Sequence, residues 1–162
     1  MSLVPWDNFF VAQLGASAAL TGLLFVGISI NMSRILSVPV LPDRALEALA
    51  LLTTILVVSS LMLVPGQSDL VLGVELTAVG LVSWAFITRL SRRVVRLSES
   101  AYRTSRRVEA ALIQIATLSW VAAGVGLVLV GDVGVDFTVL AIVLSFLEVV
   151  QISWILLVEI NR

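Results

Sequence analysis

The segment RLSRRVVRLSESAYRTSRR, residues 89–107, carries seven of the ten arginines of this chain, which contains no lysine. Long apolar runs lie on both sides of it. The other three arginines, Arg34, Arg44 and Arg162, also lie at the ends of apolar runs. If each apolar run crosses a bilayer once, all ten arginines lie on the same side of that bilayer. Because arginine-rich short loops stay in the cytoplasm, this pattern predicts the orientation of every span.

The composition is that of a membrane protein. Of the 162 residues, 59% are hydrophobic and only 13% are charged, whereas a soluble domain carries about 25% charged residues. Four aspartates fall on the side opposite the arginines: Asp7, Asp69, Asp132 and Asp136. This segregation of charge indicates topology, and we expect no nucleic-acid partner.

The residue types exclude several kinds of chemistry. There is no cysteine, histidine or lysine, which excludes disulfides, the usual zinc sites, imidazole acid–base catalysis and Schiff bases. The chain also contains no Gly-x-Ser-x-Gly, no His-Glu-x-x-His and no glycine-rich phosphate loop. We therefore expect no enzymatic activity, no metal centre and no cofactor.

Five spans are predicted, at about residues 9–31, 44–64, 69–90, 108–130 and 137–160, each long enough for about 30 Å of hydrocarbon. Pro39 and Pro42 interrupt an inner loop at residues 33–42, and residues 131–135 form a short outer loop. Asp7, Asp43 and Asp136 are predicted N-caps. The fold class is all-α: a polytopic membrane protein in one domain, residues 1–162, with its N-terminus outside and its C-terminus in the cytoplasm.

Residues 81–123 contain neither glycine nor proline, so the third helix can continue past the membrane surface. The chain is expected to reverse within residues 98–105, where hydroxyl side chains compete for backbone hydrogen bonds. This predicts a cytoplasmic helical hairpin at about residues 89–107. Its arginines serve topology, and they can also bind anionic lipid or an acidic partner at roughly 1 kcal/mol each. The residues assigned to that binding are Arg92, Arg93, Arg96, Arg103, Arg106 and Arg107.

A charged residue deep in a span is costly and marks a candidate functional site. Glu148 lies near the middle of the fifth span, and Glu75 lies about 9 Å inside the outer end of the third. Glu47 is expected to be solvated near the inner surface. We expect no arginine deep enough to neutralise Glu148 directly. The residue is therefore protonated, binds a cation or lines a hydrated path, unless it only forms a structural hydrogen bond between helices.

Other polar residues fall at matching depths. Helical spacing places Thr138, Ala141, Ser145, Glu148 and Ile152 on one stripe of the fifth span, which should face protein or water. The predicted ion pathway consists of Glu148, Gln151, Ser145, Glu75, Gln114, Thr21 and Thr54.

Small residues recur at four-residue spacing in the first span, at Gly15 and Ala19 and at Ala18 and Gly22. Such pairs allow close approach between transmembrane helices. Glycines also recur in the third and fourth spans. We therefore expect a homo-oligomer within the lipid bilayer.

The stretches WDNFF (residues 6–10), GASAALTGLLFVGISIN (residues 15–31) and LVPGQ (residues 63–67) resemble the N-terminal part of a group of small, uncharacterised bacterial multi-pass membrane proteins. Some members of that group are labelled modulators of a membrane-bound protease. The resemblance implies a bacterial cytoplasmic membrane, and it carries over no functional residue.

Two functional hypotheses follow. The first is an oligomeric ion channel or ion-coupled transport protein that handles a cation or proton at Glu148. The alternative is a non-catalytic scaffold or regulatory subunit of a larger membrane complex, which binds through the arginine-rich hairpin.

Overall fold

In the computed structural model, residues 6–98, 103–131 and 133–160 are described. The helices of this part are α1 (Asp7–Ile30), α2 (Met32–Ser37), α3 (Leu41–Met62), α4 (Asp69–Leu97), α5 (Arg103–Val130) and α6 (Val133–Ile160). Five of them, all but α2, are long and apolar enough to cross a membrane. The all-helical class and the predicted number of spans are confirmed.

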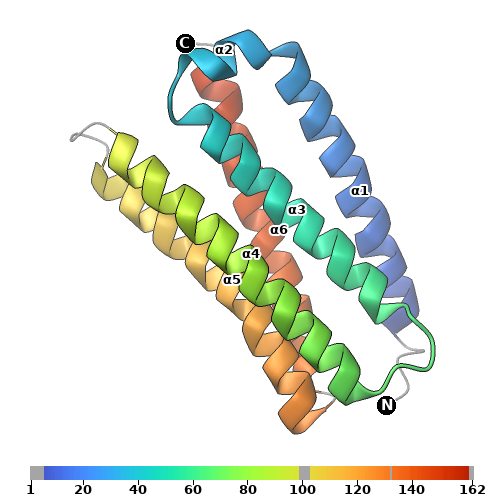
Figure 1. The fold of residues 1–162 in the computed structure, drawn as a ribbon. Helices are drawn as coiled ribbons and strands as arrows, with labels where there is room; N and C mark the ends of the chain where they lie inside the picture. Colours follow the sequence, from blue (N-terminus) through green and yellow to red (C-terminus); the bar gives the residue numbers. More distant parts are fainter. Residues whose placement is uncertain (1–5, 99–102, 132, 161–162) are drawn as a thin grey trace.

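The five long helices form one elongated bundle (Figure 1). α3 packs against α1, α4 and α6, and α5 packs between α4 and α6. α2, the start of α3, the end of α6 and the α4–α5 hairpin lie at the same end of the bundle, and the start of α1 lies at the other (Figure 1). Because α2, the hairpin and the start of α3 carry the described arginines, we call this the arginine end.

Several predicted boundaries are wrong. Residues 33–42 were expected to form a loop, but α2 occupies residues 33–37, and α3 begins at Leu41 with Pro42 in its first turn. Proline is compatible with a first turn because the N–H that it lacks has no helical partner there. At the other end, α6 begins at Val133, so residues 133–135 are helical.

The predicted aspartate caps are wrong as well. The N-cap positions of α1 and α3 are Trp6 and Val40, and Asp7 and Asp43 lie inside the first turns. Asp136 also lies in a first turn, that of α6. An acidic residue there still interacts favourably with the helix dipole.

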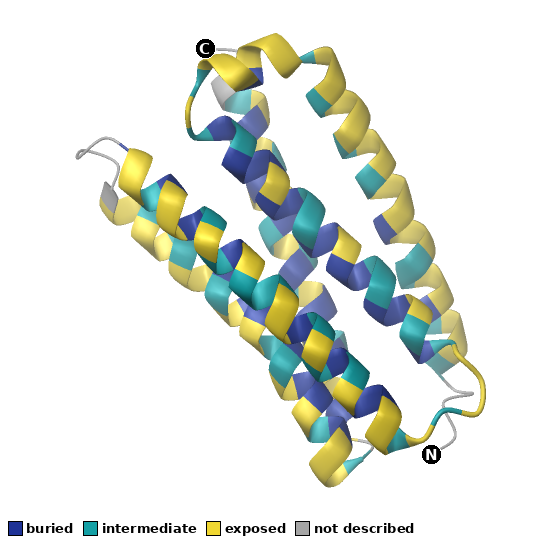
Figure 2. Cartoon of the chain, viewed as in Figure 1, coloured by how far each residue is buried: buried dark blue, intermediate teal, exposed yellow. Residues whose placement is uncertain are grey.

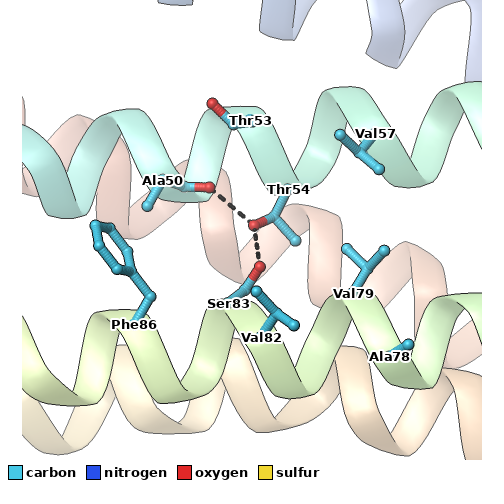
Figure 3. A pocket seen from close by; sticks show the side chains of 9 residues that line it. All are labelled: Ala50, Thr53, Thr54, Val57, Ala78, Val79, Val82, Ser83 and Phe86. Atoms are coloured by element: carbon cyan, nitrogen blue, oxygen red, sulfur yellow. Dashed lines mark hydrogen bonds between the residues drawn. The ribbon is translucent and has the colours of Figure 1, made fainter.

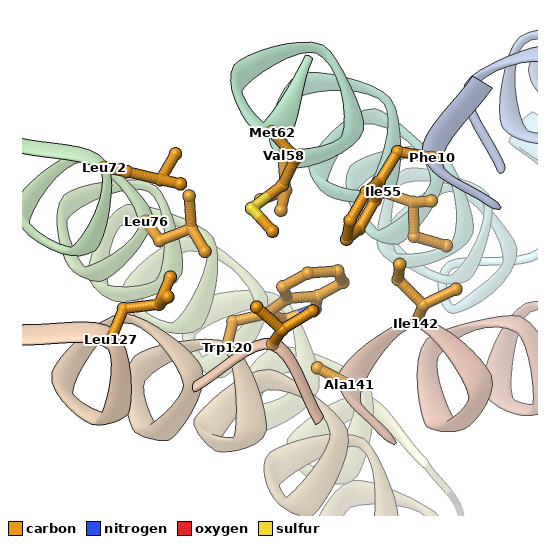
Figure 4. Close-up of a cluster of buried hydrophobic side chains, with 11 residues drawn as sticks. Phe10, Ile55, Val58, Met62, Leu72, Leu76, Trp120, Leu127, Ala141 and Ile142 are labelled. Carbon is orange, nitrogen blue, oxygen red and sulfur yellow. The ribbon is translucent and has the colours of Figure 1, made fainter. Parts of the chain in front are cut away.

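The hydrophobic core lies where α3, α4, α5 and α6 meet (Figures 2 and 4). Trp120 of α5 is fully buried at its centre, among Ile55, Leu76 and Ile142. In contrast, most of α1 is exposed (Figure 2), and its buried residues are Phe10 and Ser17. α1 is therefore a peripheral helix held mainly by α3.

Glycines bring α4 and α5 into close contact. A Cβ atom at Gly80 would lie 2.9 Å from the backbone nitrogen of Val121, and one at Gly124 would overlap the backbone of Thr77. The glycines of the third and fourth spans are thus used inside the bundle. By contrast, a Cβ atom at Gly15 or Gly22 of α1 would meet no atom within 4 Å.

We predict that Gly124→Ala lowers the melting temperature of the detergent-solubilised protein. The added methyl group must displace α4 backbone, and overpacking of this kind costs about 1–3 kcal/mol. Gly22→Ala is the matched control, because it adds the same atom on the open side of α1. Thermal unfolding followed by circular dichroism measures the difference, and equal melting temperatures for the two variants would contradict this packing.

Candidate functional site

A group of charged side chains is buried at the arginine end, between α3, α4 and α5. We define this charge network by the residues Asp43, Arg44, Glu47, Ser91, Arg93, Arg106 and Glu109. At its centre, Arg44 and Glu47 are only 4% and 1% exposed. Both lie near the start of α3, one helical turn apart, so their side chains share a face of that helix.

Arg44 links α3 to α5. Its Nη1 donates a hydrogen bond to Glu47 Oε2 at 3.2 Å, and its Nη2 donates to Glu109 Oε2. Arg106 Nη1 donates to the same oxygen of Glu109 at 2.9 Å. Glu109 therefore lies between two guanidinium groups that come from different helices.

Glu47 also reaches α4. Ser91 Oγ donates a hydrogen bond to Glu47 Oε1 at 2.6 Å, so both carboxylate oxygens of Glu47 have partners. Asp43 forms the outer edge of the network through an ion pair with Arg93, whose Nε lies 3.1 Å from Asp43 Oδ2. The Arg93 side chain is 68% exposed, so the network extends from a dry centre to the surface.

The buried charges of the network are paired with opposite charges or hydrogen-bond partners, as buried charges usually are. Charges taken out of water lose several kcal/mol of hydration each, and the loss is tolerated when opposite charges and hydrogen bonds replace the water. The network contains three carboxylates and three guanidinium groups, so its formal charges cancel. One donor is left over, since Arg44 Nε is buried with no hydrogen-bond partner in the described chain.

Glu148 of α6 lies at the edge of this network. Its half-buried carboxylate interacts electrostatically with Arg44 and Glu47. No ion pair between Arg44 and Glu148 is among the described contacts, so the expectation that no arginine neutralises Glu148 directly stays a prediction. The prediction for Glu47 is wrong, because this side chain is enclosed by three helices where a solvated side chain was expected. Glu148 makes the local formal charge negative by one.

The rest of the predicted stripe on α6 faces protein, as expected. Thr138, Ala141, Ser145 and Ile152 are buried. Ser145 accepts a hydrogen bond from Trp120 Nε1 at 3.0 Å, which ties it into the hydrophobic core. No polar path connects it to Glu148 among the described hydrogen bonds.

The structure does not bring the other predicted pathway residues together. Thr88 donates to Gln114 between α4 and α5, at 2.9 Å, and Gln67 donates to Glu75 at 2.8 Å near the opposite end of the bundle. Thr21 donates to a backbone carbonyl of its own helix. Gln151 is exposed.

Thr54, the last of these residues, is bonded across to α4. Its hydroxyl lies 2.7 Å from Ser83 Oγ and donates to the carbonyl of Ala50 at 2.8 Å (Figure 3). Both hydroxyl groups are thus engaged between α3 and α4. The predicted pathway residues are therefore not joined to one another. Thr54, Gln114 and Ser145 are bonded to neighbouring helices in separate places. Thr21 is bonded within its own helix.

The hairpin extends as α4 to Leu97 and resumes as α5 at Arg103, while its tip, residues 99–102, and the side chain of Arg103 lie outside the described residues. Of its arginines, Arg93 and Arg106 belong to the charge network. Arg89, Arg92, Arg96 and Arg107 are exposed.

Sequence reasoning missed Arg44, Glu47 and Glu109 as site residues. All three lie within a few residues of predicted span ends, where solvation is the ordinary expectation. One signal was available, because Glu109 is an isolated acid directly after a strongly basic segment. Among the described residues, no group of three or more acidic side chains is arranged to hold a metal ion.

Comparison of the chain with protein-family models, with curated proteins and with solved structures gives no match.

We predict that Arg44→Met destabilises the protein by roughly 3–5 kcal/mol, because it leaves the buried Glu47 carboxylate without its counter-ion. Arg92→Gln is the control, since this exposed arginine makes no ion pair in the described chain and its loss should change stability by less than about 0.5 kcal/mol. Reversible unfolding in mixed micelles measures both values. A stability of Arg44→Met equal to that of the control would mean that Glu47 is hydrated.

Proposed function

We propose that this chain is an ion channel or ion-coupled transport protein that binds and releases a proton or small cation at Glu148, beside the charge network. The observation that carries the proposal is the position of Glu148. It is a half-buried carboxylate next to a buried set of charges that already cancel one another.

The charge balance supports a cationic ligand. Within the network, guanidinium groups match carboxylates in number, so the carboxylate of Glu148 is in excess. In a medium of low dielectric constant, an uncompensated charge is costly, and binding a proton or a cation removes that cost. Glu148 lies on α6, whereas Arg44 and Glu47 lie on α3. Neutralising Glu148 therefore changes the electrostatic interaction between α6 and α3.

The distribution of polar groups favours coupled transport or a narrow relay over a wide pore in one chain. The residues predicted to line a path are hydrogen-bonded in separate places. Glu75, Gln114 and Ser145 each accept one of these hydrogen bonds. Thr54 is bonded to Ser83 of α4. Ion movement in this proposal therefore accompanies rearrangement around Arg44, which contacts the carboxylates of Glu47 and Glu109 and interacts electrostatically with that of Glu148.

We predict that Glu148→Gln reduces ion flux in proteoliposomes to the level of empty liposomes, because glutamine keeps the shape of the side chain but cannot bind a proton or balance a cation. A pH-sensitive dye reports proton flux, and parallel assays with Na⁺ and K⁺ gradients identify a cation.

Glu75→Gln is the matched control for this experiment. It makes the same chemical change at the opposite end of the bundle, where Glu75 accepts a hydrogen bond from Gln67. Flux should persist in the control. Full flux in Glu148→Gln, or no flux in the wild-type protein under any of these gradients, would exclude the proposal.

The exposed arginines of the hairpin favour a second candidate, a non-catalytic scaffold or regulatory subunit of a larger membrane complex. Arg92, Arg96 and Arg107 are exposed and make no ion pair in the described chain. A cluster of exposed guanidinium groups suits an acidic surface of a partner.

This second candidate predicts that replacing Arg92, Arg96 and Arg107 together by glutamine abolishes a specific crosslink to another membrane protein in native membranes. Glu148→Gln should leave that crosslink intact. Mass spectrometry identifies the crosslinked chain, and the topology of the triple variant must be verified because these arginines also affect orientation. An unchanged crosslink in the triple variant counts against the scaffold.

A further inference from the structure

A groove of about 550 Å³ lies between α3 and α4. Its walls are formed by Ala50, Thr53, Thr54 and Val57 of α3 and by Ala78, Val79, Val82, Ser83 and Phe86 of α4 (Figure 3). The groove lies at the surface of the bundle, since Val82 and Phe86 on its wall are 71% and 43% exposed. In a chain that spans a membrane, this surface faces the bilayer.

The walls of the groove are apolar in effect. The hydroxyls of Thr54 and Ser83 are bonded to each other, and that of Thr53 donates to the carbonyl of Leu49 at 2.8 Å. Because these three hydroxyl groups already form hydrogen bonds within the protein, a ligand in the groove would contact mainly methyl groups and the ring of Phe86. Such a surface suits a hydrocarbon chain and gives little to an ion or a polar solute.

The length of the groove fits one leaflet. From Ala78 to Phe86 the α4 wall rises about 12 Å at 1.5 Å per residue. Half of a hydrocarbon core of about 30 Å is about 15 Å. Phe86 marks the end of the groove that is nearer to the arginine end, so the groove covers the depth of the leaflet on that side.

Two arginines continue the same face of α4 beyond the groove. Arg89 follows Phe86 by three residues and Arg93 follows it by seven, which is helical spacing. Both are exposed. Arg93 lies beside Asp43, whereas Arg89 makes no ion pair in the described part of the chain. A guanidinium group binds phosphate oxygens through two parallel hydrogen bonds.

We propose that the groove and Arg89 form a binding site for one anionic phospholipid. One acyl chain lies between α3 and α4, and the phosphate contacts Arg89, with Arg93 adding positive charge nearby. Charge complementarity favours this occupant over an apolar helix of a second copy, which could fill the groove but would leave the Arg89 guanidinium without an anion. The proposal is independent of ion binding at Glu148.

The test uses native mass spectrometry of the full chain, delipidated in detergent and titrated with phosphatidylglycerol or with phosphatidylcholine of the same acyl chains. The wild-type protein should retain one phosphatidylglycerol in preference to phosphatidylcholine. Arg89→Gln should weaken phosphatidylglycerol retention about fivefold and leave phosphatidylcholine unchanged. Val82→Trp, a change at an exposed wall position that fills the groove, should weaken retention of both lipids.

Two control variants make the same kinds of change away from the groove. Arg34→Gln removes an exposed arginine from α2, and Ala122→Trp adds bulk on an exposed position of α5; both should retain lipid as the wild type does. Equal effects of Arg89→Gln and Arg34→Gln would overturn the proposal. So would unchanged retention in Val82→Trp, or a dimer that Val82→Trp abolishes, because the groove would then hold a second copy.

Discussion

The arrangement of the helices at the arginine end depends on one guanidinium group. Arg44 is almost fully buried, and it donates to carboxylates on its own helix and on α5 while it interacts electrostatically with Glu148 on α6. A buried charge of this kind fixes the positions of its partners, since any shift that separates them leaves charge in a medium of low dielectric constant. The relative positions of α3 and α5 are therefore constrained together, and the hydrogen bond from Ser91 to Glu47 adds α4 to them.

Away from that end, close packing replaces charge as the constraint. Gly80 and Gly124 let the backbones of α4 and α5 approach, and Trp120 fills the centre of the bundle with its indole N–H bonded to Ser145. Apolar contacts are present at the arginine end too, since Ile35, Leu41 and Ala45 belong to a second buried hydrophobic cluster there. That end differs because it also contains buried ion pairs.

The two proposals use different surfaces of this structure. Glu148 is half-buried at the edge of the charge network, whereas the groove between α3 and α4 is apolar and extends from Ala78 to Phe86. Asp43 and Arg93 lie near both, because their ion pair closes the network and Arg93 also continues the face above the groove. A lipid bound in the groove would be separated from the buried charges by the ion pair between Asp43 and Arg93.

The sequence by itself determined the five spans, the collection of arginines at one end and the buried stripe on α6, because long apolar runs, loop charge and helical spacing are local properties of the chain. It could not determine which charges meet. Arg44 and Glu109 are 65 positions apart, and Ser91 reaches Glu47 across 44. Each of these residues looks interfacial on its own, and only the packing of α3, α4 and α5 removes them from water. The same packing separated Ser145, Gln114 and Thr54 into unconnected hydrogen bonds, because equal depth in the membrane says nothing about which side of a helix faces which neighbour.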